Sequence, residues 1–243
     1  MNCSDRISII LVRPQIAGNV GFTARSMKAF GFRNLALVNP EFPLNRQSPA
    51  CKTASGAHDI LDSCRCHDSL SSALQDMNYV YGFSRREHDL IRPKLSITEW
   101  IDRMQALDAQ ATVALLFGSE DFGLLNEDKK FCDALVYIPL AESTLSLNLS
   151  HAITIVLYEL YKSLTTDHHS TQSQSLSPPV TVQEQQRLHD LILSLLQNTR
   201  YLKPGREEQQ SEAIRHWIQR FHLTKDEYHA VIGFVQSLTK LSR

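Results

Sequence analysis

Long apolar runs are missing from this chain of 243 residues. Its longest apolar stretches, such as residues 7–12 and 153–160, fall well short of the ~20 residues that a membrane-spanning helix needs. The beginning of the chain also lacks the pattern of a secretion signal, because Asp5 and Arg6 precede a short apolar run that ends at Arg13. We therefore expect a soluble protein of the cytoplasm that does not enter a membrane.

Cysteine is scarce and irregularly placed, which excludes a disulfide framework. The five cysteines stand at positions 3, 51, 64, 66 and 132, an odd number without regular spacing. Cys64, Cys66 and His67 resemble a fragment of a metal site, but a second ligand pair at zinc-site spacing is missing. We expect reduced thiols and no bound metal.

An excess of basic residues, common in RNA-binding domains, is absent as well. The formal net charge is −1, so composition gives no support for RNA binding and any nucleic-acid surface must be a local patch. We do not expect DNA as a partner. The candidate patches are Arg25, Lys28 and Arg33, then Arg85, Arg86, Arg92 and Lys94, then Arg200, Lys203 and Arg206.

Short apolar runs alternate with amphipathic stretches over the first two-thirds of the chain. The spacing of apolar residues predicts helices over residues 20–30 and 97–106. Runs rich in β-branched or aromatic residues predict buried parallel strands. This alternation indicates an α/β fold with a parallel sheet. The predicted strands cover residues 7–12, 35–38, 79–83, 113–117 and 134–138.

A polar stretch separates this region from a helical tail. Residues 163–180 are rich in Ser, Thr, Gln and His, which predicts a flexible linker between a first domain, 1–162, and a C-terminal domain, 181–243. Thr181 with Glu184, and Thr224 with Glu227, form capping boxes that open two helical patterns. A third helix lies around residues 213–221. The tail is therefore predicted to be a small all-helical bundle.

Three polar, turn-prone segments stand next to apolar runs in the first domain. They are Gly-Asn-Val-Gly-Phe-Thr-Ala-Arg (18–25), Phe-Gly-Ser-Glu-Asp-Phe-Gly-Leu (117–124) and Ser-Thr-Leu-Ser-Leu-Asn-Leu-Ser-His-Ala (143–152). In this order they closely resemble the three signature motifs of the trefoil-knotted (SPOUT) RNA ribose 2′-O-methyltransferases. The resemblance covers residues 6–162 and implies a knotted parallel-sheet domain that binds S-adenosylmethionine.

The resemblance also implies which residues form the site. The family's catalytic positions fall on Asn19, Arg25, Glu120, Ser146 and Asn148. Its cofactor contacts fall on loops that follow predicted strands, at Phe83, Ser84, Arg85, Gly118, Ile138, Leu145, Ser146 and Leu147. Gly118 is expected to let the backbone approach a ligand closely, and a turn that ends a strand is the alternative for it. For Asn148 the alternative is the capping of a helix.

Chemistry limits what Arg25 can do. A guanidinium stays protonated up to a pKa above ~12, so it is a poor general base. We expect Arg25 to stabilise the developing 2′-alkoxide and the adjacent phosphate, with proton removal shared between Ser146 and water. The carboxylate of Glu120 is expected to order Arg25 or Asn19, or to accept backbone amides. No metal is required, because the leaving group is a neutral thioether.

Further segments, including Phe32 to Pro40 and Leu124 to Glu127, resemble the TrmJ-type tRNA methyltransferases, which act on cytidine or uridine at position 32. That resemblance implies a homodimer in which Arg25 acts near the partner's cofactor, and a helical tail that binds tRNA. Ser119 departs from the arginine common at this place, which leaves the fine choice of substrate open. The alternatives are a ribosomal-RNA 2′-O-methyltransferase, a non-catalytic RNA-binding protein of the same fold, and a flavodoxin-like nucleotide-binding protein.

Overall fold

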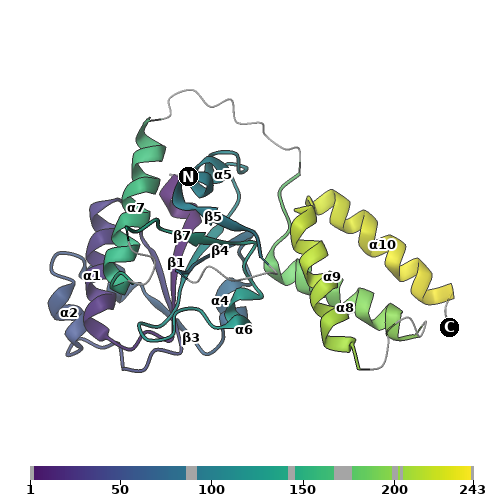
Figure 1. Cartoon of the computed structure of the whole chain (residues 1–243), viewed down its shortest axis with the longest axis horizontal. Helices are drawn as coiled ribbons and strands as arrows, with labels where there is room; N and C mark the ends of the chain where they lie inside the picture. The colour runs from purple at the N-terminus through teal and green to yellow at the C-terminus, as the bar shows by residue number, and fades with distance from the viewer. Residues whose placement is uncertain are drawn as a thin grey trace.

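The first part of the chain forms one parallel sheet. The computed structural model describes residues 3–85, 92–141, 146–166, 177–198, 202 and 205–241. Over these residues, all strand pairs are parallel and their spatial order is β3-β2-β1-β6-β4-β7-β5 (Figure 1). The strands are β1 (Ile7–Val12), β2 (Asn34–Val38), β3 (Arg65–His67), β4 (Tyr79–Phe83), β5 (Lys94–Ser96), β6 (Val113–Phe117) and β7 (Ala134–Tyr137).

The central strands form because their sequences are apolar on both faces. Every residue of β1 and β6 is buried, as expected for parallel strands covered on two sides. The predicted strands are confirmed, with β2 beginning at Asn34 and β7 ending at Tyr137. The edge strands β3 and β5 were not predicted, because each has three residues that are exposed or half-buried.

Helices cover both faces of the sheet. A short 3-10 helix, η1, precedes β1, and the small helices α2 and α3 follow β2. The alternating residues Ile7, Ile9 and Leu11 pack with α1, α5 and α7. On the other face, Ile10 and Val12 pack with α4 and with Leu124 and Cys132, which flank α6. The helices of this part are η1 (Cys3–Arg6), α1 (Ala17–Ala29), α2 (Pro49–Thr53), α3 (His58–Asp62), α4 (Leu70–Leu74), α5 (Ile97–Gln105), α6 (Asn126–Lys129) and α7 (Leu149–Thr166).

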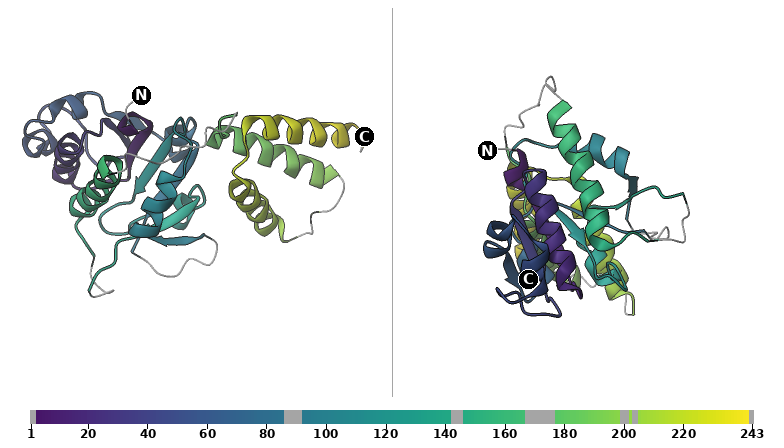
Figure 2. Two further views of the ribbon diagram at one scale, coloured as in Figure 1. Left: turned by 90° about the horizontal axis from the view of Figure 1, so that it is seen from above. Right: turned by 90° about the vertical axis from the view of Figure 1, so that its left-hand side faces the viewer.

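Helices α1 and α7 lie side by side at one end of the molecule (Figure 2, right). Where they meet, the hydroxyl groups of Ser26 and Thr154 are hydrogen-bonded at 2.7 Å, and Phe30 packs against Tyr158 and Tyr161 with ring centroids 6.0 and 5.7 Å apart. A polar contact and an aromatic cluster therefore fix these two helices against each other.

The tail forms a separate three-helix bundle. Its helices are α8 (Val182–Asn198), α9 (Glu207–Phe221) and α10 (Lys225–Leu241), and Figure 1 shows them beside the sheet, opposite α1 and α7. Their core contains Val180, Leu188, Ile214, Ile218 and Tyr228.

Both predicted capping boxes are present in the tail. The Thr181 amide donates to Glu184 Oε2 at 2.8 Å, and the Thr224 amide donates to Glu227 Oε2 at 2.8 Å. Helix α7 continues to Thr166, so the helical part of the first domain extends past residue 162. Residues 167–176 of the predicted linker lie outside the described residues. The predicted domain boundaries therefore stay a prediction.

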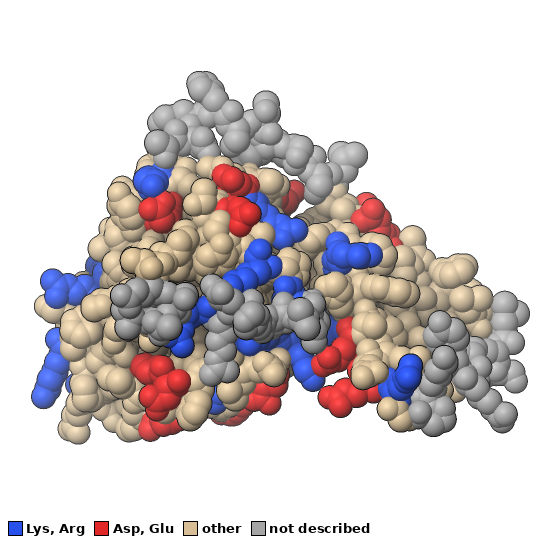
Figure 3. Space-filling view, in the orientation of Figure 1, with Lys and Arg blue, Asp and Glu red and all other residues tan. Residues whose placement is uncertain are grey.

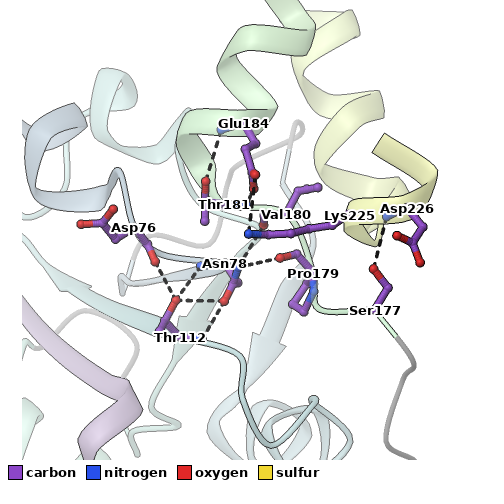
Figure 4. Close-up of polar contacts among 10 residues, drawn as sticks. All are labelled: Asp76, Asn78, Thr112, Ser177, Pro179, Val180, Thr181, Glu184, Lys225 and Asp226. Carbon is purple, nitrogen blue, oxygen red and sulfur yellow. Dashed lines mark hydrogen bonds and ion pairs between the residues drawn. The ribbon is translucent and has the colours of Figure 1, made fainter. Parts of the chain in front are cut away.

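Asn78 joins the two parts of the chain (Figure 4). Its Nδ2 donates to the carbonyl oxygens of Pro179 and Val180, at 2.9 and 3.2 Å. Its Oδ1 accepts from the amide and the hydroxyl group of Thr112, at 2.8 and 2.9 Å. The amide of Val182 donates to the Met77 carbonyl oxygen at 2.8 Å. One side chain thus links β4, the segment before β6 and the first residues of the helical bundle.

None of the described helices is both long and apolar enough to cross a membrane.

We predict that Asn78→Asp loosens the helical bundle from the sheet. The substitution replaces a donor with a carboxylate oxygen that faces the carbonyl oxygens of Pro179 and Val180. Losing these bonds is expected to lower the free energy of unfolding by about 1–3 kcal/mol. Hydrogen exchange of the Val182 amide should become faster, and thermal unfolding should shift downward. Asn126→Asp, on the exposed surface of α6, is the control, and equal behaviour of the two variants would contradict the prediction.

Candidate active site

A pocket of about 200 Å³ lies where the loops after β4, β6 and β7 meet the beginning of α7. Ligands of open parallel sheets bind outside the carboxyl ends of the strands, and these loops leave the sheet at that edge. The structure brings most of the predicted cofactor residues together here. Those that line the pocket are Phe83, Ser84, Arg85, Gly118, Ile138, Ser146 and Leu147. Leu145 lies outside the described residues.

Two stacked aromatic rings lie at the base of this pocket. Phe83 and Phe117 end neighbouring strands, and their ring centroids are 4.6 Å apart with an interplanar angle of 10°. Trp100 of α5 packs edge-on against Phe83, with centroids 5.1 Å apart. Both phenylalanines are buried, so the pocket has a rigid apolar base.

Gly118 is required by the loop itself. A Cβ atom at this position would lie 1.9 Å from the carbonyl carbon of Gly123 and 2.2 Å from the Leu124 nitrogen. Gly123 adopts a left-handed φ of 65°, and its amide donates to the Ser119 carbonyl oxygen at 2.8 Å. The sequence analysis expected the missing side chain to make room for a ligand, whereas the structure shows the returning backbone in that space. The tight turn puts Gly118 at the pocket wall.

Glu120 connects the first and the middle motifs. Its carboxylate accepts from the backbone amides of Gln15 and Ile16, at 2.9 and 3.3 Å, and from Nδ2 of Asn19, at 2.7 Å. The sequence analysis considered Arg25, Asn19 or backbone amides as its partners. The structure shows Asn19 together with two amides. A carboxylate at the beginning of α1 also interacts favourably with the helix dipole.

Asn148 extends this network to the third motif. Its Nδ2 donates to Asn19 Oδ1 at 3.1 Å. Its Oδ1 accepts from the amide and the hydroxyl group of Ser150, at 2.9 and 2.7 Å, which is the geometry of a helix N-cap at the beginning of α7. The two functions considered for Asn148 therefore occur together, and one chain of hydrogen bonds, Glu120–Asn19–Asn148–Ser150, joins all three motifs.

Arg25 is separate from this network within one chain. It is exposed on α1 and forms no hydrogen bond or ion pair with any residue that the structure describes. It is also not among the residues that line the pocket, whereas Glu120 and the exposed Ser146 are. The structure thus assembles four of the five predicted catalytic residues and leaves Arg25 on the surface.

Sequence reasoning missed several residues of the site. Phe122, Val136, Leu140 and Ala152 also line the pocket. Val136 could have been found from its place near the end of an apolar strand. Phe122 could have been found as the second aromatic residue of the middle motif.

Among the described residues, no group of three or more His, Cys, Asp and Glu side chains is placed to hold a metal ion. The pocket offers instead an apolar base, a glycine-lined wall, the carboxylates of Glu120 and Asp121 and the guanidinium of Arg85. The amide side chains of Asn19 and Asn148 follow Glu120 in the hydrogen-bond chain. Such a set suits an organic ligand that is gripped by backbone groups and small side chains.

Comparisons with known proteins agree with this arrangement. The sequence profile of the SpoU rRNA methylase family matches residues 6–158. Two relatives are each 32% identical. One is the tRNA (cytidine/uridine-2′-O-)-methyltransferase TrmJ of Pectobacterium atrosepticum, over 97% of this chain and 98% of the relative. The other is the tRNA (cytidine/uridine/adenosine-2′-O-)-methyltransferase TrmJ of Pseudomonas aeruginosa, over 98% of this chain and 96% of the relative.

Solved structures show the same fold. The crystal structure of TrmJ from Z. mobilis ZM4 superimposes with a TM-score of 0.80 at 27% identity, covering 95% of this chain and 98% of that one. A structure described as giving insights into the 2-OH methylation of C/U34 on tRNA has a TM-score of 0.52 at 30% identity, over 66% of this chain and 97% of that one. The family profile matches more than half of the chain, and hydrogen bonds join the three motifs, so the chain belongs to the SpoU rRNA methylase family.

Proposed function

We propose that the chain transfers a methyl group from S-adenosylmethionine to a ribose 2′-hydroxyl of tRNA. The observation that carries this proposal is the hydrogen-bond chain from Glu120 through Asn19 to Asn148, which gathers the three motifs beside one pocket. The near full-length relatives named as tRNA 2′-O-methyltransferases support tRNA as the substrate class. We also propose that the enzyme acts in the cytoplasm, where its tRNA substrate is found.

The pocket fits the methyl donor by its chemistry. Backbone groups around Gly118 and the small side chains of Ser84 and Ser146 offer hydrogen-bond partners, and the stacked Phe83 and Phe117 rings offer apolar surface. When bound there, S-adenosylmethionine supplies an electrophilic methyl group on a sulfonium. We infer that the described residues 138–141 and 146–148 belong to a knotted cover of this pocket.

The chain's own residues align and activate the acceptor. The reaction forms a bond between the ribose oxygen and the methyl carbon, and it breaks the sulfur–methyl bond. Holding oxygen and methyl group in line supplies much of the rate. Arg25 stabilises the developing oxyanion as a permanent cation. The exposed Ser146 hydroxyl lies at the pocket and passes the 2′-hydroxyl proton to water.

A homodimer brings Arg25 to a pocket. On the paired helices α1 and α7, the aromatic side chains of Phe22, Tyr158 and Tyr161 are 46%, 49% and 44% exposed. Exposed apolar surface on neighbouring helices is typical of a protein interface. Arg25 extends from the same helix as Phe22. We propose that α1 and α7 pack against a second copy, so that Arg25 of one subunit acts in the pocket of the other.

A basic band supports tRNA binding. Lys and Arg side chains gather across the middle of the face in Figure 3, where the helical bundle meets the sheet domain. We propose that the tRNA body crosses this junction, since phosphates bind to local clusters of exposed cations.

The target nucleotide of the proposal is cytidine or uridine at position 32 of the anticodon loop. Ribosomal RNA is the second candidate substrate, since the matched family is named for rRNA methylation. A non-catalytic RNA-binding protein is the third candidate. The assembled Glu120–Asn19–Asn148 network argues against it, because RNA binding alone does not need that network.

We predict methylation of unmodified tRNA transcripts by the purified protein and S-adenosylmethionine, with the product at position 32 by mass spectrometry. Arg25→Ala should reduce kcat by about 100-fold or more, because it removes charge stabilisation of the transition state. Arg25→Lys should recover only part of the rate, since an ammonium lacks the guanidinium fork. The control is Lys28→Ala on the same helix, where Lys28 pairs with Asp59 at 2.7 Å. Methylation of ribosomal RNA alone would support the second candidate, and none at all would refute the enzyme.

We predict that Phe22→Asp converts a dimer into monomers, because it replaces an exposed aromatic side chain of the proposed α1 interface with a charge. Sedimentation velocity measures the change, and methylation should be lost together with the dimer. Phe234→Asp is the control, because Phe234 is 65% exposed on α10, in the helical bundle at the opposite end of the molecule.

Mixing two inactive variants tests the shared site directly. An Arg25→Ala subunit keeps its pocket, and a Gly118→Val subunit keeps its arginine. In a mixed dimer one complete site is restored, so activity should return when the two variants are combined. A dimer that survives Phe22→Asp, or a mixture that stays inactive although mixed dimers form, would contradict this arrangement.

A further inference from the structure

Phe122 is an exposed aromatic residue at the edge of the pocket. Its side chain is 61% exposed, although it lines the pocket together with Glu120 and Gly118. A residue that is mostly exposed and still contacts the pocket lies at its mouth. The network that joins the three motifs does not use it.

The loop that carries Phe122 is held by its surroundings. The Phe122 amide donates to Ser119 Oγ at 3.4 Å, and the Asp121 amide donates to Gln15 Oε1 at 3.3 Å. Gly123 closes the turn through its amide, which is bonded to the Ser119 carbonyl oxygen. Glu120 is fixed on the other side by the amides of Gln15 and Ile16. The backbone at Phe122 is therefore anchored on both sides.

An exposed aromatic ring on an anchored loop at the mouth of a site can stack against a planar group of the substrate. The proposed reaction places a ribose at this mouth, with its 2′-oxygen directed inward. The base of the same nucleotide is attached to the carbon next to the reacting one, so it lies at the mouth as well. Bases stack on exposed aromatic side chains.

We propose that Phe122 stacks on the base of the nucleotide that is methylated. This assignment rests on the proposed 2′-O-methylation of tRNA and adds a substrate-positioning contact to it. The ring face contacts any base and reads no hydrogen-bond pattern. Phe122 therefore aligns the ribose without selecting between cytidine and uridine. Its contribution is to substrate binding and orientation and does not extend to cofactor binding.

A thermodynamic cycle of two changes, Phe122→Ala in the protein and removal of the target base from the tRNA, tests this contact. The modified tRNA carries an abasic ribose at the target position and keeps its 2′-hydroxyl. Losing one stacked base is expected to lower kcat/KM by about five- to 150-fold. Phe122→Ala on intact tRNA should show a similar loss. Phe122→Ala on abasic tRNA should show no further loss, because the same contact is already absent. If the two changes instead lower kcat/KM independently, so that their effects multiply, the assignment is overturned.

Further measurements separate stacking from other functions of the ring. Phe122→Ala should keep its affinity for S-adenosylhomocysteine by calorimetry and its dimer by sedimentation, and Phe122→Tyr should restore kcat/KM. A weakened cofactor complex or a lost dimer would overturn the assignment, since the ring would then contact the cofactor or the partner subunit. Phe234→Ala is the control: removing the target base should lower its kcat/KM by the same factor as it does for the wild type.

A spectroscopic probe reports the contact without catalysis. Phe122→Trp is made in a Trp217→Phe background, so that the fully buried Trp100 is the only other tryptophan. Its emission should be quenched by intact tRNA and remain unchanged with abasic tRNA; equal quenching by both would refute stacking. If the wild type methylates no tRNA, the proposed function fails and this assignment fails with it. If the wild type is active but the effects of Phe122→Ala and of the abasic target multiply, only the assignment of Phe122 is overturned.

Discussion

The carboxylate of Glu120 holds the beginning of α1 against the loop that follows β6. It accepts two backbone amides, of Gln15 and Ile16, and the side-chain amide of Asn19. Hydrogen bonds to a charged acceptor are stronger than neutral ones, so this one group orders two segments that lie more than 100 positions apart. Asn19 then aligns Asn148, which begins α7. The positions of all three motifs depend on this contact.

The pocket is tightly packed within one chain, whereas one predicted catalytic residue lies away from it. The turn at Gly118 and Gly123 leaves no room for a side chain, and the stacked Phe83 and Phe117 fix the base of the pocket. The pocket is therefore preorganised for the methyl donor. The group that would stabilise the oxyanion, on Arg25, lies on the surface of α1. In the proposed dimer the pocket, with Ser146 and Phe122, comes from one subunit and Arg25 comes from the other.

Much of the fold could be predicted from sequence, because burial on both faces produces continuous apolar runs such as β1 and β6. The edge strand β3 has no such signal, since Arg65–His67 is extended only through its pairing with β2. The members of the site were identified by resemblance to known motifs. Asn19 and backbone amides were among the expected partners of Glu120, but Gln15 and Ile16 could not be identified as the donors, because no periodicity links them to Glu120. Phe122 was missed because one aromatic residue in a turn has no pattern of its own.

The most direct measurement on this account compares Glu120→Gln with Glu127→Gln, a matched change at a solvent-exposed carboxylate. Hydrogen exchange of the Gln15 and Ile16 amides is followed together with S-adenosylmethionine binding and methyl transfer. We predict that Glu120→Gln accelerates exchange at both amides and lowers kcat/KM by about 10–100-fold, the range for lost bonds to a charged group. The control should behave as wild type. Unchanged exchange with wild-type methyl transfer in Glu120→Gln would contradict the account.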